Sequence, residues 1–288
     1  MNDIIDIRHL RSWIGRTEEA EDTILPRLVD DFYATLGQRR DPARDGDAAP
    51  LAVHWCLAPP IVANQDTGPD GHPARGGFLP PVPLPRRMWA GGELRFERPL
   101  RVGETVRRVS RVDDVVLKEG RSGRLCFVTV RHDILAKGGA RAIAERQDIV
   151  YRDETAPAGK APPAARNGNE KEPEADASHA VEATPLMLFR YSALTFNGHR
   201  IHYDRTYARE IEHYPGLVVH GPLQATLLLH LGSGMLPRGA TASIFSYRGV
   251  QPLFDGSMSV NGRREGDGLK LWSATAEGVA TMKAEMRG

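Results

Sequence analysis

The sequence predicts an α+β protein made of two similar halves, each an antiparallel sheet wrapped round a central helix. Three observations support this prediction: a composition break near residue 155, a β-rich pattern that occurs once on each side of it, and one strongly apolar helix in each half. With 288 residues, the chain is long enough for two domains of about 100–150 residues each. We therefore expect a tandem duplication.

The break between the halves is predicted to be a linker over residues 155–182. Most of this stretch reads TAPAGKAPPAARNGNEKEPEADASHA, which is rich in Ala, Pro, Gly and charge and holds no large apolar residue. Such a segment cannot bury enough surface to offset the entropy lost on ordering, so it is expected to be exposed. The predicted domains are then residues 1–154 and 183–288.

The repeated pattern consists of long strands joined by Gly-containing turns. In each half a stretch with an aromatic residue, a Pro-Leu dipeptide and a Gly comes before the strands. The expected strands are 106–116, 125–135 and 142–151 in the first half and 258–263, 269–277 and 279–286 in the second. The same order on both sides of the linker indicates a duplicated domain.

Each half also has one convincing helix near its start. Residues 24–36 place apolar side chains at every fourth position, with Asp22 or Thr23 as the expected N-cap. Residues 222–231 are apolar around much of the helix circumference, so this second helix is expected to be wrapped by other structure.

Composition argues against nucleic acids and membranes as partners. Lys+Arg (38) and Asp+Glu (37) nearly cancel, whereas a duplex-binding protein normally has a strong basic excess. No apolar run approaches the ~18–20 residues needed to span a bilayer, and the N-terminus has no signal-like apolar stretch. Cys56 and Cys126 lie in strand-like contexts and are interpreted as buried small hydrophobes. We expect a soluble cytoplasmic protein.

The densest cluster of titratable residues lies in the segment RYSALTFNGHRIHYDRTYA, residues 190–208. Within eight positions it holds Asn197, His199, Arg200, His202 and Asp204. The segment YPGLVVHGPL, residues 214–223, follows and leads into the apolar helix. A loop with two imidazoles and an amide, next to a helix start with free N–H groups, can supply a base and an oxyanion site together.

These two segments resemble the MaoC-like hot-dog hydratases, most closely the two-domain hydroxyacyl-thioester dehydratase branch that includes mesaconyl-CoA and itaconyl-CoA hydratases. WIGRTE at 13–18 and PRRMWAGG at 85–92 are similar to the degenerate first domain of that branch. The resemblance covers nearly the whole chain outside the linker. It implies a double hot-dog fold in which residues 183–288 form the catalytic domain.

The resemblance also implies roles for single residues. The wider family has the pattern Gly-Asp-x-Asn-Pro-x-His-x-Asp, whose catalytic His falls on His202 and whose last Asp falls on Asp204. This chain departs from the pattern twice, because Asn197 stands where the family has its catalytic Asp and His199 where it has Asn. The backbone oxyanion donor of the family falls on Gly221.

Hydration of an enoyl thioester requires attack of water on Cβ while charge builds on the thioester oxygen. His202, as an imidazole with an ordinary pKa of about 6.5, can take the proton of the water, and the amide of Asn197 can hold that water. The N–H of Gly221 can stabilise the enolate, and a glycine lets the thioester approach the backbone. His199 is expected to orient Asn197 or to share in proton transfer.

Other polar residues are expected around the acyl group. Asp204 is expected mainly as an N-cap, His220 as a packing or backbone-bonding residue beside the oxyanion site, and Tyr191 as a pocket wall. Arg86 and Arg87 either bind CoA phosphates or a substrate carboxylate, or lie in a solvated loop. Arg200 is the other candidate for a substrate carboxylate.

No metal is expected, because no spaced cluster completes a site with His199, His202 and Asp204. No cofactor is expected either, since coenzyme A is part of the acyl-CoA substrate. A homodimer is compatible with the sequence.

The favoured reaction is reversible hydration of a short branched dicarboxylic enoyl-CoA, itaconyl- or mesaconyl-CoA, to citramalyl-CoA. One alternative is a 3-hydroxyacyl-thioester dehydratase of fatty-acid synthesis, which would need a long apolar tunnel. A hot-dog acyl-CoA thioesterase is a second alternative, although the start of the helix at 222–226 offers no carboxylate. A non-catalytic acyl-CoA sensor would normally carry a DNA-binding element, and none is apparent.

Overall fold

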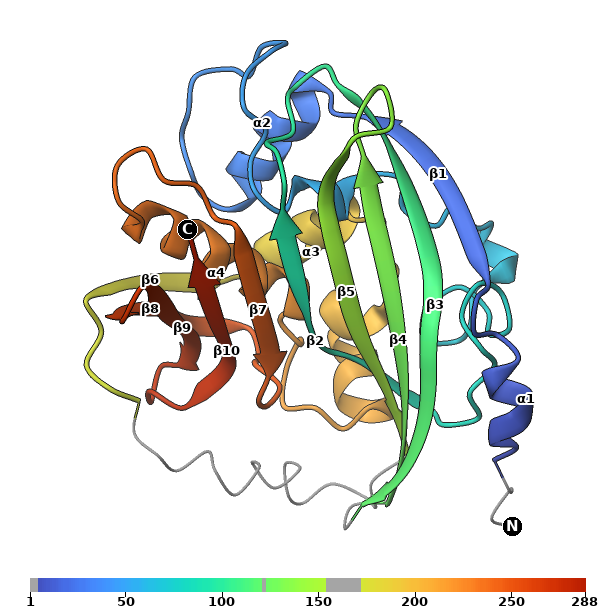
Figure 1. Cartoon of the computed structure of the whole chain (residues 1–288). Helices are drawn as coiled ribbons and strands as arrows, with labels where there is room; N and C mark the ends of the chain where they lie inside the picture. Colours follow the sequence, from blue (N-terminus) through green and yellow to red (C-terminus); the bar gives the residue numbers. More distant parts are fainter. Residues whose placement is uncertain (1–4, 121–122, 154–171) are drawn as a thin grey trace.

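The ten strands of the structure, a computed structural model that describes residues 5–120, 123–153 and 172–288, form one continuous antiparallel sheet (Figure 1). The strand order is β1-β3-β4-β5-β2-β7-β10-β9-β8-β6. Among the described residues, no helix combines the length and the apolar character needed to cross a bilayer.

The elements of the first half are α1 (Ile7–Arg11), β1 (Thr17–Thr23), α2 (Pro26–Thr35), the short turns η1 (Val53–Cys56) and η2 (Asn64–Asp66), β2 (Arg86–Phe96), β3 (Thr105–Gly120), β4 (Gly123–Leu135) and β5 (Arg141–Arg152). Those of the second half are β6 (Ala177–Ala183), α3 (Pro185–Leu194), the short turns η3 (Arg200–His202) and η4 (Tyr207–Ile211), α4 (Gly221–Met235), β7 (Ile244–Gly249), β8 (Gly256–Glu265), β9 (Gly268–Thr275) and β10 (Ala280–Arg287).

The strand order confirms the predicted duplication. Read from each outer edge inward, the first half runs β1-β3-β4-β5-β2 and the second β6-β8-β9-β10-β7, so each strand has its counterpart five places later. The halves join where β2 pairs antiparallel with β7, with Gly92 opposite Tyr247. A Cβ at Gly92 would overlap the Arg146 carbonyl oxygen and the Tyr247 hydroxyl, so only glycine fits at this seam. The fold is α+β, as the strand pattern predicts.

The two halves differ in their helices, and here one prediction was wrong. The helix expected over 24–36 is α2, but it follows the first strand of its half as α3 does, so it is the counterpart of α3. In the described part of the first half only the four-residue turn η1 lies between α2 and η2, so that half has no equivalent of α4. The single long helix α4 is buried against the sheet, as expected.

The predicted N-caps of α2 were also wrong. The helix begins after Leu25, which has no side chain able to cap it, and Pro26 fills its first turn, where a missing N–H costs little. The Asp22 carboxylate instead accepts a hydrogen bond from the backbone of Ala58 at 2.8 Å, and Thr23 pairs with Thr105 across β1 and β3.

The two halves share one main hydrophobic core around α4. Phe32 and Leu94 of the first half belong to the same buried cluster as Leu228 and Phe245 of the second. Burying each such side chain contributes about 1.5–3 kcal/mol. A second cluster, made only of first-half residues, joins Val112 of β3 and Val128 of β4 to Tyr151 of β5 and to Leu84 before β2.

The linker prediction needs correction at its end. Strand β6 begins at Ala177 and pairs with β8, so regular structure starts before residue 183. Residues 154–171, which make up most of the predicted linker, lie outside the described residues.

Both cysteines are free and buried, as the sequence predicts. Cys126 lies in strand β4, but Cys56 lies in η1 and not in a strand. Burial raises the pKa of Cys56 to about 12 and that of Cys126 to about 11, so both stay protonated thiols at neutral pH.

Candidate active site

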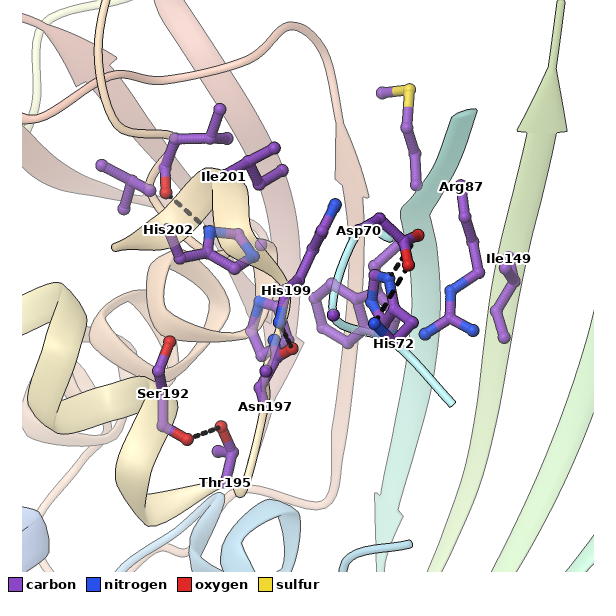
Figure 2. Close-up of a pocket in the computed structure, with 18 of the residues that line it drawn as sticks. Asp70, His72, Arg87, Ile149, Ser192, Thr195, Asn197, His199, Ile201 and His202 are labelled. Carbon is purple, nitrogen blue, oxygen red and sulfur yellow. Dashed lines mark hydrogen bonds and ion pairs between the residues drawn. The ribbon is translucent and has the colours of Figure 1, made fainter. Parts of the chain in front are cut away.

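A cavity of about 1120 Å³ lies at the N-terminal end of α4 and is lined by both halves of the chain (Figure 2). Its walls include Asn197, His199, His202 and Gly221 from the second half and Asp70, His72, Arg87 and Trp89 from the first. The predicted base and the predicted oxyanion donor therefore share one cavity.

His202 presents a free ring nitrogen to this cavity. Its Nδ1 lies 2.7 Å from the Val218 carbonyl oxygen, and because a carbonyl only accepts, Nδ1 carries the proton and Nε2 keeps its lone pair. Burial lowers the pKa of His202 to about 4, against the Val218 hydrogen bond, which raises it. The ring is therefore neutral at neutral pH and able to accept a proton.

The ring of His220 packs against the ring of His202. The two rings stack at 3.7 Å between centroids and 18° between planes. His220 Nε2 lies 2.8 Å from the hydroxyl of Ser192 on α3, and its Nδ1 has no hydrogen-bond partner among the described residues. Burial lowers the pKa of His220 well below its usual range, so this ring too is neutral.

The loop that carries Asn197 and His199 starts where α3 ends. Phe196 takes a left-handed conformation with φ 48°, which is uncommon for a bulky residue and marks a constrained turn. The Asn197 side-chain oxygen then accepts the backbone N–H of His199 at 3.0 Å. The expected relationship is thus reversed: Asn197 holds the backbone of His199, and its amide NH₂ makes no hydrogen bond with another described residue.

Three histidines and one carboxylate line the cavity in a row, and a fourth histidine, His220, is buried behind His202 outside the cavity wall. Ring centroids are 4.1 Å apart for His72 and His199 and 5.3 Å for His199 and His202, and His202 is followed by the stacked ring of His220. At the other end, an oxygen of Asp70 lies 3.1 Å from His72 Nδ1. Burial first, then the neighbouring imidazoles His72 and His202, lower the pKa of His199.

Asp70 and His72 were missed by sequence reasoning. They lie in irregular chain between η2 and β2. In the sequence they are far from the loop after α3 that carries Asn197, His199 and His202, which is called the catalytic loop below. The only signal available was an Asp and a His separated by one glycine, which is too common to single out.

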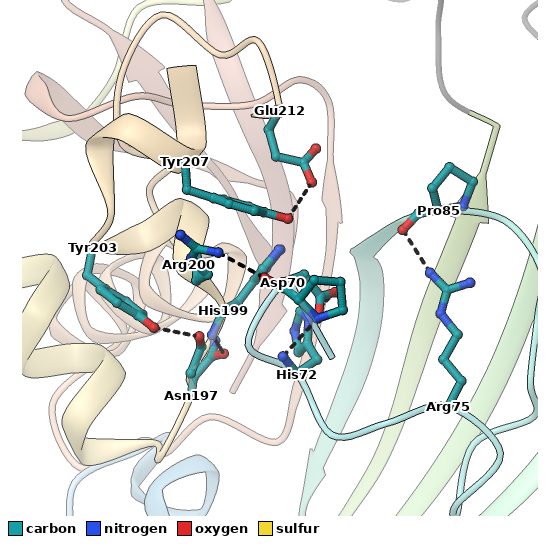
Figure 3. A network of polar contacts seen from close by, with 12 residues as sticks. Asp70, His72, Arg75, Pro85, Asn197, His199, Arg200, Tyr203, Tyr207 and Glu212 are labelled. Carbon is teal, nitrogen blue, oxygen red and sulfur yellow. Dashed lines mark hydrogen bonds and ion pairs between the residues drawn. The ribbon is translucent and has the colours of Figure 1, made fainter. Parts of the chain in front are cut away.

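The segment 69–72 is fastened to the catalytic loop (Figure 3). The backbone N–H of Arg200 donates to the Asp70 carbonyl oxygen at 2.9 Å, and its guanidinium donates to the Pro69 carbonyl oxygen at 3.1 Å. Gly71 has φ +86°, and a Cβ there would overlap the Gly198 carbonyl. Glycine is therefore needed at Gly71 for both its conformation and its close approach.

Of the three candidate arginines, two form ion pairs with carboxylates of the described chain and one does not. Arg86 pairs with Glu212 at 3.5 Å, and Arg200 pairs with Asp204 at 2.8 Å. Arg87 lines the cavity and forms no ion pair with any described carboxylate. Of these three, Arg87 is thus the cation that a bound carboxylate can reach; Arg152 lines the same cavity and likewise forms no ion pair with a described carboxylate.

Two residues expected to bind substrate lie elsewhere. Arg200 and Asp204 do not line the cavity among the described residues. Asp204 instead accepts the backbone N–H of Tyr207 at 3.0 Å and caps the turn η4. This hydrogen bond, together with Arg200, lowers the pKa of Asp204. Tyr191 does line the cavity, and its hydroxyl lies 3.3 Å from that of Thr226 on α4.

Gly221 opens α4, and its N–H makes no hydrogen bond with the described residues. Because Pro222 follows and has no N–H, the Gly221 amide is the donor at the tip of the helix. A Cβ at Gly221 would come within 2.8 Å of the Trp89 ring. Glycine is thus required for the packing of Trp89, in addition to the substrate approach expected from the sequence.

Trp89 belongs to an aromatic wall supplied mainly by the first half. It stacks on Tyr247 at 4.5 Å between centroids and meets Trp55 edge to face at 5.4 Å. This wall covers one side of the tip of α4, where a less polar environment strengthens a hydrogen bond to a developing oxyanion.

One trio among the described residues, Asp70, His72 and His199, brings metal-binding atoms within 4.8 Å of one another. It shares only His199 with the trio considered from the sequence. Asp70 and His72 Nδ1 already bond to each other, which leaves fewer free donor atoms for an ion. In this structure the Asp70–His72 part of the trio is a hydrogen-bonded pair.

Comparison with known proteins places the chain in a family. Residues 52–255 match the family described as hydroxyacyl-thioester dehydratase type 2. The chain is 43% identical to mesaconyl-C(4)-CoA hydratase of Chloroflexus aurantiacus over 276 residues, which cover 95% of each protein.

Solved structures agree on the fold. HtdX of Mycobacterium tuberculosis superposes with a TM-score of 0.66 at 21% identity, covering 95% of this chain and 100% of that one. A further protein of that organism, described as a double hot-dog, gives a TM-score of 0.58 at 15% identity over 95% of each chain. The chain therefore belongs to the hydroxyacyl-thioester dehydratase type 2 family and is a hydro-lyase with a double hot-dog fold.

Proposed function

We propose that this protein reversibly hydrates a short branched dicarboxylic enoyl-CoA, mesaconyl-CoA or itaconyl-CoA, to citramalyl-CoA. The observation that carries the proposal is Arg87, a cation without a carboxylate partner among the described residues, in the same cavity as His202 and Gly221. The 43% identity to a mesaconyl-C(4)-CoA hydratase over most of the chain supports it.

In the proposed reaction, His202 Nε2 accepts a proton from water as the water oxygen bonds to Cβ. The π electrons of the double bond move towards the thioester, and the Gly221 N–H stabilises the enolate oxygen. A single oxyanion donor of this kind contributes about 3–4 kcal/mol to the transition state. The free amide NH₂ of Asn197 is placed to hold the water or the thioester by donating a hydrogen bond.

Arg87 explains the preference for a second carboxyl group. Beside it lie His72 and the Tyr151 hydroxyl, and Arg87 opposes the burial that raises the pKa of Tyr151. A half-buried cation without an ion-pair partner is costly, and a substrate carboxylate would neutralise it through paired N–H···O bonds. A linear fatty acyl chain would leave this cation unpaired.

The thioesterase alternative has less support. Gln224 is the polar side chain of α4 that reaches the cavity, and it carries no charge. Its amide oxygen already accepts hydrogen bonds from Ser273 and Thr281, both at 2.9 Å. The helix therefore presents no carboxylate to attack or activate water at the thioester carbon.

A panel of purified thioesters tests the proposal. Mesaconyl-CoA esterified at either carboxyl, itaconyl-CoA, crotonyl-CoA and a long-chain 2-enoyl-CoA are incubated with the protein, and the product masses are measured. We expect a gain of one water on a dicarboxylic substrate and little on crotonyl-CoA. Preferred hydration of the long chain would favour the fatty-acid dehydratase, and release of free thiol would favour the thioesterase.

The cytoplasm is the compartment that we propose, as the sequence suggests. Two free, buried thiols, Cys56 and Cys126, support a reducing environment. Fractionation of the source cells with the protein detected by antibody tests this location.

A further inference from the structure

The first half brings a carboxylate–imidazole pair into the active-site cavity, and the mechanism above does not use it. Asp70 and His72 are joined at 3.1 Å, and both line the cavity. Their side chains are mostly covered, with 27% and 13% of their surface exposed. Figure 2 shows His72 and His202 on opposite sides of His199.

Hydration of a double bond moves two protons, and the catalytic loop has only one clear group for them. Water loses a proton, which His202 accepts, and Cα must gain one. Asn197 cannot exchange a proton, and Asp204 is bonded to Arg200 and Tyr207 away from the cavity wall. His199 also lines the cavity, but burial first and then the rings of His72 and His202 lower its pKa, and its ring makes no hydrogen bond with a described carboxylate. The imidazole that does have a carboxylate partner comes from another segment.

We infer that His72, positioned by Asp70, is the acid that protonates Cα, an inference that rests on the proposed hydration. The water oxygen bonds to Cβ while His202 Nε2 takes the water proton. The enolate electron pair then forms the Cα–H bond with the proton of His72 Nε2, which leaves His72 neutral. The proton on His202 returns to His72 before the next turnover, so no proton is gained or lost.

The orientation of His72 suits this role. Its Nδ1 faces Asp70, so Nε2 is the nitrogen left for the substrate, and the carboxylate stabilises the imidazolium that donates. Arg87, Arg75 and the ring of His199 also face His72, and burial with these two arginines lowers its pKa while Asp70 raises it. Asp70 is thus the one carboxylate that opposes their effect on His72 among the described groups.

The pair is also rigidly placed, as proton transfer requires. The backbone bond from Arg200 to Asp70 fixes the segment 69–72 against the catalytic loop, and the contact of Gly71 with Gly198 leaves no room between them. A proton donor held in this way keeps a constant distance from His202 and from the acyl group.

The test compares Asp70→Asn and His72→Gln with wild type and with Asp66→Asn, an exposed carboxylate of the preceding turn η2 outside the cavity wall. His72→Gln should lower kcat for hydration by about 10²–10⁴-fold with little change in KM. Asp70→Asn should lower kcat less and should move the basic limb of the pH profile to lower pH. The sign follows because removing the carboxylate lowers the pKa of His72, and only the protonated ring can donate. Asp66→Asn should match wild type.

An isotope effect separates this role from a structural one. With the hydrated thioester deuterated at Cα, His72→Gln should increase the primary isotope effect on dehydration, because C–H cleavage becomes slower than the other steps. An unchanged isotope effect and an unshifted pH profile would overturn the inference. So would loss of wild-type activity with EDTA and its recovery with Zn²⁺, which would assign the trio to an ion.

Wild-type protein is assayed first on the thioester panel. Absence of hydration there contradicts the proposed function itself. Normal wild-type hydration with wild-type behaviour in Asp70→Asn and His72→Gln contradicts only the role of this pair.

Discussion

The two halves of the sheet follow one strand order, yet the chain after α2 in the first half differs from the chain after its counterpart α3 in the second. In the second half this stretch forms the loop with Asn197 and His202 and then the long helix α4. In the first half it contains only the short turns η1 and η2 and irregular chain before β2. Within its described residues, the first half has no long helix in this stretch. Part of the stretch, residues 69–72, lies against the catalytic loop of the second half.

The difference separates two kinds of contribution to one cavity. The second half provides the helix tip and the histidine loop, which act on the reacting atoms in the proposed mechanism. The first half provides a wall of the cavity in Trp89, a positive charge in Arg87 and the proposed proton donor in the Asp70–His72 pair. Substitutions in each half can therefore test whether the two contributions differ in this way.

The largest effect is expected on the side of the second half. His202→Ala should lower kcat by about 10³–10⁴-fold, because no other ring in the loop has a free nitrogen held in place by a carbonyl. Circular dichroism should stay close to wild type, whereas the unfolding midpoint should fall because a buried ring stacked on His220 is lost. Turnover near the wild-type rate in a folded variant would show that the base lies elsewhere.

On the side of the first half, Arg87→Met should affect specificity more than chemistry. We expect kcat/KM for the dicarboxylic thioester to fall by about 10²–10³-fold, the cost of losing a charge-assisted pair, while the low activity on crotonyl-CoA changes little. Arg95→Met, in the same strand but outside the cavity wall, is the matched control. Equal losses on both substrates would contradict a role in carboxylate recognition.

Acid should lower the free energy of unfolding of the protein through the neutral histidines of the second half. The folded pKa of His202 is about 4, below the ordinary value of about 6.5, so its contribution to stability is present above pH 6.5 and lost as the pH falls towards 4. The free energy of unfolding measured in urea should therefore decrease over this window, with His202 accounting for about 3 kcal/mol.

The matched variants for this pH dependence are His202→Gln and His179→Gln. The first should flatten the dependence, whereas the second replaces an exposed histidine of β6 and should keep the wild-type slope. Equal slopes in all three proteins would mean that His202 does not remain neutral in the folded state.

The smallest effect concerns the contact that holds the halves in register at the site. Gly71→Ala and Gly76→Ala both place a side chain at positive φ, but only at Gly71 would the new Cβ also overlap a neighbouring backbone. We expect Gly71→Ala to unfold at lower urea and to cost about 2 kcal/mol more than Gly76→Ala. It should also lower kcat, because the segment 69–72 must move. Indistinguishable stabilities would mean that the two loops separate at little cost.

The sequence predicted the parts of this molecule whose cause is local. Long alternating strands and turns with glycine define β3, β4, β8 and β9 within a residue or two at most ends. The helix α4 could be predicted because its apolar residues surround it, and the catalytic loop because its imidazoles are close together in the sequence.

What escaped prediction depends on contacts between distant segments. Arg200 meets Pro69 across 131 residues, and nothing near either residue signals the other. The place of Trp89 over Gly221 has the same origin. The role of α2 was misjudged because an amphipathic pattern predicts a helix but does not say whether that helix corresponds to α3 or to α4.

The pairing of β2 with β7 has a consequence for any attempt to dissect the protein. A fragment that starts at residue 172 would expose the whole hydrogen-bonding edge of β7, which now faces β2 along Gly91–Arg95. Bare edges of this kind recruit other chains, so such a fragment should associate with itself or aggregate. It would also lose the tryptophan cover of its helix tip. Because the halves share one sheet, one core and one cavity, we expect that neither half works as an enzyme without the other.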